Sequence, residues 1–91
     1  VTPIENAVTI AEGIAIGAPA RGGEILGSLR SVSAHIITVT DDEVRSAQSM
    51  LAAAGFFVEP TAAVCMAAYS KTPCEGVSVV PLCGAGLKSA K

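Results

Sequence analysis

HIITVTDDEVRSAQSMLAAAGFFVEP, residues 35–60, contains the clearest helix start in this chain. Residues 35–40 are rich in β-branched side chains, which fit a pleated and half-buried surface, so they predict a strand. Thr40 and Glu43 then have the spacing of a capping box, in which each side chain bonds to the other residue's backbone N–H. Gly55 suits the left-handed position just past a helix end. The helix expected between these signals has one apolar face, made by Val44, Ala47, Leu51 and Ala54.

The sequence on either side continues this alternation of helix and strand. Pro19 suits the first position of a helix, and apolar residues at helical spacing predict a helix over 20–31. The apolar run 56–58 predicts a short strand or turn, and an apolar helix follows Pro60. Residues 77–82 predict a last strand that is apolar on both faces, as in covered parallel sheets. The expected fold class is therefore α/β, a layered unit of mostly parallel strands with covering helices.

The composition predicts one small domain, residues 1–91, whose apolar faces are covered by additional protein. Its residues are 51% hydrophobic and 15% charged, whereas the usual charged share is about 25%. A chain this short buries a smaller share of its surface than a larger domain does. We therefore expect apolar faces that this chain cannot bury by itself.

Charge and residue content argue against several classes of function. The net charge is −2 and the six Lys and Arg residues are scattered, so no basic stripe suits nucleic acid. The apolar run 62–68 is far shorter than the roughly 20 residues that cross a bilayer, so no membrane association is expected. With His35 as the one histidine, no metal site is expected. Three evenly spaced cysteines suit free thiols in a reducing, cytoplasmic compartment.

Cys83 stands where the apolar run 79–82 meets the glycines of Gly84-Ala85-Gly86. In open α/β sheets, ligands bind beyond the carboxyl ends of the strands, so a thiol at this junction could face a ligand. The alternative is a buried thiol that ends a strand, because free cysteine packs as a small hydrophobe. The local pattern leaves both interpretations open.

Four stretches resemble the carboxy-terminal part of the pyridoxal-phosphate enzymes of the tryptophan-synthase-β type, which have fold type II. They are TIAEGIAIGAPARGGEIL (9–26), VTDDEVRSAQSMLAAAGFFVEPTAA (39–63), the apolar helix after it, and VVPLCGAGLK (79–88). GIAIGAPARG and GLK favour the threonine synthases of this family, whereas FVEPTAA is shared with its serine and threonine dehydratases. The resemblance implies pyridoxal 5'-phosphate as cofactor, a small amino-acid substrate and a homodimer when the enzyme is full length.

The resemblance also implies which residues of this chain meet the cofactor. Cys83 is placed against the pyridine nitrogen, and Gly84 could let the backbone approach the ring or merely turn the chain. Glu59, in the EP motif, is placed near the ring, although a carboxylate at a helix start can equally serve as a plain cap. Threonine synthases usually have threonine where this chain has Cys83, and several dehydratases have serine or cysteine there. The chemistry of the enzyme is thus open between these two classes.

The family's cofactor-binding lysine and its glycine-rich phosphate loop have no match here, since Lys71, Lys88 and Lys91 fit neither motif. No catalytic residue is therefore assigned, and we expect the 91-residue chain to be inactive without the remainder of the parent enzyme. Three functions stay open. The first is part of a threonine synthase, which converts O-phosphohomoserine and water to threonine and phosphate. The others are part of a dehydratase and a stand-alone α/β binding module.

Overall fold

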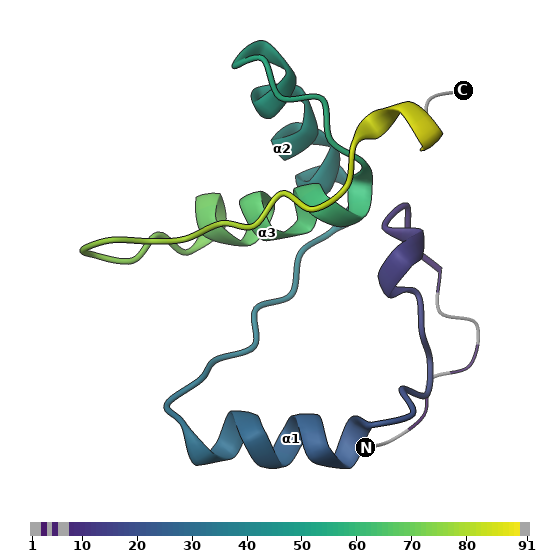
Figure 1. Cartoon of the computed structure of the whole chain (residues 1–91), viewed down its shortest axis with the longest axis vertical. Coiled ribbons are helices and arrows are strands. Elements are labelled where there is room, and N and C mark those ends of the chain that lie inside the picture. The colour runs from purple at the N-terminus through teal and green to yellow at the C-terminus, as the bar shows by residue number, and fades with distance from the viewer. Residues whose placement is uncertain (1–2, 4, 6–7, 90–91) are drawn as a thin grey trace.

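The computed structural model describes residues 3, 5 and 8–89, and within them the chain forms three α-helices and two short 3-10 helices (Figure 1). In chain order these are η1 (Glu12–Ile14), α1 (Gly22–Ser31), α2 (Asp41–Ala53), α3 (Pro60–Lys71) and η2 (Gly86–Ser89).

Helix α2 begins and ends as its sequence predicts. The Thr40 hydroxyl accepts a hydrogen bond from the Glu43 N–H at 3.2 Å, and the Glu43 carboxylate accepts one from the Thr40 N–H at 2.8 Å. This reciprocal pair is the predicted capping box. Gly55 has a φ of +97°, the left-handed conformation expected just past the helix end.

Helices α2 and α3 pack against each other and form the core of the described structure. The predicted face of α2 is confirmed for Val44, Ala47 and Leu51, whereas Ala54 lies beyond the helix and is exposed. Small residues on α3 let the two helices approach closely, and Ala63 is fully buried. The core cluster comprises Val44, Ala47, Leu51, Val58, Ala62, Ala63 and Ala67.

Helix α1 lies apart from the α2–α3 pair (Figure 1). It begins at Gly22 rather than at the predicted residue 20, because Pro19 and the residues after it form a turn in which the Gly22 N–H donates to the Pro19 carbonyl at 3.2 Å. The radius of gyration is 14.2 Å, against about 12 Å expected for a compact domain of this length. The fold is therefore open rather than closed around a single core.

The predicted parallel sheet does not form among the described residues. Residues 34–40 and 77–84 are extended but belong to no strand, and the one β-interaction in this part of the chain is an isolated antiparallel bridge between Val58 and Ala85. The physical reason is that a strand exists through its hydrogen bonds to a neighbour, and these two segments have no such neighbour within residues 8–89.

A large apolar surface accompanies the missing sheet. The accessible surface is 6748 Å², whereas a compact protein of this mass exposes roughly 4,900 Å². The extended segments contribute to this surface, with Ile36 exposed to 71%, Val79 to 87% and Val77 to 98%. The excess of apolar residues read from the composition thus appears as uncovered surface.

Candidate cofactor-binding site

Glu59 and Gly84, two of the three predicted site residues, lie against each other at the start of α3. Glu59 occupies the N-cap position, and Pro60 is the first helical residue, where its missing N–H costs nothing. The Glu59 N–H donates to the Gly84 carbonyl at 3.0 Å. The Glu59 side chain makes no capping hydrogen bond to its own helix, although a carboxylate at this position still interacts favourably with the helix dipole.

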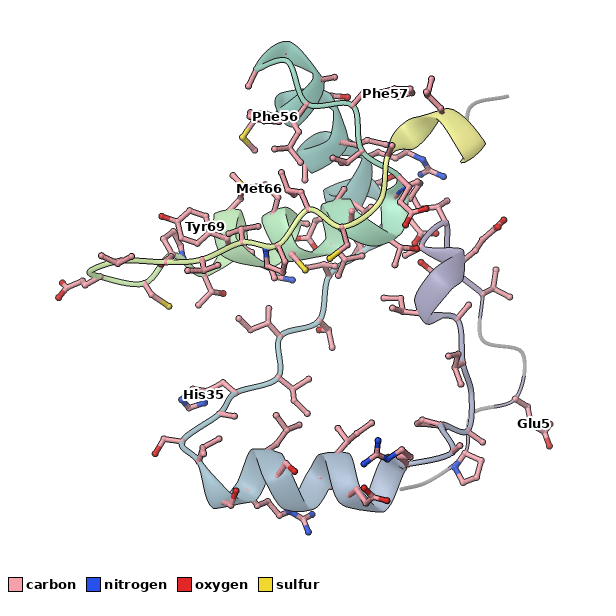
Figure 2. The ribbon with its side chains drawn as sticks, in the orientation of Figure 1. Glu5, His35, Phe56, Phe57, Met66 and Tyr69 are labelled. Carbon is pink, nitrogen blue, oxygen red and sulfur yellow. The ribbon has the colours of Figure 1, made fainter. Side chains whose placement is uncertain are left out.

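A short antiparallel pairing fixes this contact. The bridge joins Val58 to Ala85, and on its other side the Gly86 N–H donates to the Phe57 carbonyl at 3.0 Å. Figure 2 shows Phe57 beside the last 3-10 helix, η2. Val58 is buried in the α2–α3 core, and the Gln48 side-chain amide donates to its carbonyl at 2.9 Å. The glycine segment is therefore tied to the core through residues 57–59.

Gly84 lies so close to Glu59 that a side chain at position 84 would force the Glu59 side chain to move. A Cβ added at Gly84 would lie 2.7 Å from Cγ of Glu59 and closer still to its carboxyl group. No ordinary Cβ contact is that short. The arrangement holds the Glu59 carboxyl group directly over the backbone at Gly84.

Cys83 lies immediately before this contact, at the end of the extended segment. Its thiol is free, and the residue is exposed rather than buried. In this structure neither the burial nor the strand of the alternative interpretation, a buried thiol ending a strand, is present. An exposed thiol here is available to whatever lies beside residues 83–84.

Segment 9–14 reaches the same end of α3, a feature that the sequence reasoning missed. The Thr61 hydroxyl accepts a hydrogen bond from the Gly13 N–H at 3.0 Å. Asp41, the first residue of α2, accepts a hydrogen bond from the Thr9 hydroxyl at 2.6 Å and one from the Ile10 N–H at 3.3 Å. The signal available in the sequence was the hydroxyl of Thr61 at the second position of a helix. Its partner, Gly13, is 48 residues away and could not be predicted from the sequence.

The charged cluster at the opposite end of α3 is separate from this site. Lys71 donates to the Thr38 carbonyl at 3.0 Å and to the Glu43 carboxylate at 3.2 Å. The hydrogen bond from the Thr40 backbone, and then that from Lys71, lower the pKa of Glu43 below its ordinary value of 4.5. Lys71 is one 12-residue helix away from Glu59, which is roughly 18 Å along the axis. It links α2, α3 and residues 38–40 and does not belong to the candidate site.

Comparison with known proteins identifies the family to which the chain belongs. The family model for pyridoxal-phosphate dependent enzymes matches residues 1–84. The chain belongs to this family. The enzymes of this family depend on pyridoxal phosphate, in agreement with the cofactor that the motif resemblance implies.

Two curated proteins are similar to this chain over most of its length. The chain is similar to the threonine synthases of Methanocaldococcus jannaschii and Methanosarcina acetivorans, with 37% identity to each over 78 residues. The aligned part is 85% of this chain and 19% of each relative, so the chain spans about a fifth of the length of these curated relatives. It corresponds to one part of a much longer pyridoxal-phosphate dependent enzyme, and this membership favours an enzyme part over a stand-alone binding module.

The described residues contain neither a candidate metal site nor a helix that could span a membrane. No three His, Cys, Asp or Glu side chains among residues 3, 5 and 8–89 gather in a way that could hold a metal ion. Within the same residues, no helix has the length and apolar character needed to span a membrane.

Proposed function

We propose that this chain is the carboxy-terminal part of a pyridoxal-phosphate dependent threonine synthase, which converts O-phosphohomoserine and water to threonine and phosphate. The observation that carries the proposal is the meeting of two family motifs at the start of α3. FVEPTAA and VVPLCGAGLK are separated in sequence, yet Glu59 of the first contacts Gly84 of the second. Similarity to two threonine synthases supports the choice of reaction.

The groups at this position suit the ring of the cofactor. The bound cofactor supplies an electron sink for bond breaking next to the amino-acid carbon. The Cys83 thiol, uncharged and exposed, is proposed to face the pyridine nitrogen. A neutral partner leaves this nitrogen largely unprotonated, because no opposite charge stabilises the protonated form. Gly84 is proposed to let the backbone approach the ring. The Glu59 carboxyl group is proposed to lie near the ring and to accept a hydrogen bond from the cofactor.

The remaining chain of the parent enzyme is proposed to supply the cofactor-binding lysine and the phosphate loop. In this proposal residues 1–91 form a single α/β unit of that enzyme, and the unit alone is inactive. The enzyme is proposed to act as a homodimer on a small amino-acid substrate. Three free thiols in the described chain fit a cytoplasmic location.

The same remaining chain is proposed to complete the parallel sheet. Ile37 from one extended segment and Val77 and Val79 from the other line one hollow, together with Tyr69 of α3. Strands from the parent enzyme would pair with these segments and bury their apolar side chains. The surface excess of roughly 1,800 Å² is larger than the roughly 800 Å² that each partner buries in a standard interface.

A dehydratase is the second candidate, and Cys83 favours it. The resemblance places serine or cysteine at this position in several dehydratases and threonine in most threonine synthases. A dehydratase of the family would convert serine or threonine to a 2-oxo acid and ammonia.

The test compares the complete enzyme with the 91-residue chain. Each is supplied with pyridoxal phosphate and O-phosphohomoserine, and phosphate and threonine are measured. The complete enzyme is expected to release one phosphate for each threonine, whereas the chain releases none and shows no cofactor absorption band that survives dialysis. Ammonia release from threonine without phosphate release from O-phosphohomoserine would identify a dehydratase. A stoichiometric band on one lysine of the isolated chain would refute the proposal that the lysine lies elsewhere.

A further inference from the structure

Segment 9–14 is attached to the rest of the structure by side chains from two helices. Asp41, the first residue of α2, accepts from the Thr9 hydroxyl and from the Ile10 N–H. The Thr9 hydroxyl accepts in turn from the Ala11 N–H at 3.2 Å. The Ala11 side chain is almost fully buried. This anchoring sets the path of the chain into η1.

The last attachment is made by Thr61 and is sterically tight. Its hydroxyl accepts from the Gly13 N–H at 3.0 Å. A Cβ added at Gly13 would lie 2.9 Å from this hydroxyl oxygen and 3.0 Å from the Thr61 methyl group. The hydrogen bond therefore depends on the absence of a side chain at Gly13, and η1 rests directly on the first turn of α3.

The position of Thr61 relative to the candidate site follows from the chain itself. Thr61 is two residues after Glu59, whose backbone and carboxyl group contact Gly84. The first turn of α3 thus carries η1 through Thr61 and the glycine segment through Glu59. Helix η1 and the predicted cofactor residues Glu59 and Gly84 are thus attached to the same end of α3.

We infer that Thr61 is a positioning residue that holds η1 as a wall of the cofactor site beside Glu59 and Gly84. It acts through η1 and does not itself touch the cofactor. The inference rests on the proposed function, because the wall has a role only if the cofactor binds at the start of α3. Thr61→Ser keeps the hydroxyl and should preserve the wall, whereas Thr61→Ala removes the acceptor for Gly13.

The first measurement is amide hydrogen exchange on the wild-type chain and its variants. In Thr61→Ala we expect the Gly13 amide to exchange roughly ten-fold faster, the equivalent of one hydrogen bond. Amides in the middle of α2 should keep their wild-type rates. Thr61→Ser should behave as wild type, and so should Thr72→Ala, which makes the same change at the exposed far end of α3. Equal acceleration throughout the chain would mean that Thr61 merely stabilises the fold and would overturn the inference.

The second measurement is cofactor affinity in the complete enzyme, by absorbance titration. Thr61→Ala is expected to weaken pyridoxal-phosphate binding by roughly 3- to 10-fold, with Thr61→Ser and Thr72→Ala unchanged. Gly13→Ala, which pushes η1 off Thr61, should weaken binding in the same direction, and Gly23→Ala, where an added Cβ meets nothing within 4 Å, should not. If wild type binds the cofactor and all variants match it, the inference fails alone. If wild type binds none, the proposed function fails and the inference with it.

Discussion

The Gly84→Ala substitution should displace the Glu59 side chain while leaving the fold in place. The added methyl group would occupy the space now held by the Glu59 carboxyl group, 2.7 Å from its Cγ. The obstructing atoms are the end of a flexible side chain, so the carboxyl group can turn away while the backbone stays in place. The bridge between Val58 and Ala85 does not depend on the Glu59 side chain and is expected to persist.

Two magnitudes follow from this geometry. Moving Glu59 to a less favourable rotamer costs about 1 kcal/mol of folding free energy. The loss of a hydrogen bond that the Glu59 carboxylate accepts from the cofactor costs about 1.5–3 kcal/mol, which weakens binding by roughly 10- to 150-fold. The substitution should therefore reduce the free energy of cofactor binding by more than it reduces the free energy of unfolding.

The assay is an absorbance titration of the complete enzyme with pyridoxal phosphate, paired with thermal unfolding. Glu59→Ala is the reference, because it deletes the carboxyl group that Gly84→Ala displaces, and the two should lose similar affinity. Gly27→Ala is the control, because an added Cβ there meets nothing within 4 Å. Cofactor affinity in Gly84→Ala equal to that of Gly27→Ala would refute the assignment of Glu59 to the cofactor.

The remaining predictions concern the core, the pH response and Cys83. Val44→Ala should lower the unfolding free energy by about 1.5–2 kcal/mol, from about 0.8 per buried methylene plus a cavity. Val77→Ala, at a 98% exposed position, should change the unfolding free energy by less than about 0.5 kcal/mol. Similar losses in the Val44 and Val77 variants, measured by urea unfolding, would contradict the assignment of Val44 to the core. Because the folded-state pKa of Glu43 is lowered, its stabilising contribution is present above pH 4.5 and is lost as the pH falls through the lower folded value. Glu43→Gln should flatten that part of the stability profile, and an unchanged profile would contradict the hydrogen bonds that the Thr40 N–H and Lys71 donate to Glu43. In the complete enzyme, Cys83→Ser should retain the wild-type cofactor spectrum and product ratio, whereas Cys83→Asp should alter both by favouring a protonated ring nitrogen; identical behaviour would exclude Cys83 as its partner.

What could be predicted from sequence was local. The capping box of Thr40 and Glu43, the stop at Gly55 and the proline at the start of α3 depend on residues within one or two turns, and the structure confirms each. The contact between Glu59 and Gly84 was reached only through the motif resemblance, because nothing in residues 57–86 encodes it as a spacing. The bond from Gly13 to Thr61 joins residues 48 apart and has no sequence signature.

The strands were predicted from the right property and still did not form. Ile36, Val77 and Val79 have the β-branched side chains that a buried strand uses, and all three are exposed here. Burying such a side chain fully contributes about 1.5–3 kcal/mol, so these three together account for roughly as much free energy as a small domain's whole stability. That contribution requires other strands on either side of residues 34–40 and 77–84. The α2–α3 pair, whose apolar faces meet within the described chain, can form without them. The helical pairing is therefore encoded within this chain, and we expect the sheet to form only in the complete enzyme.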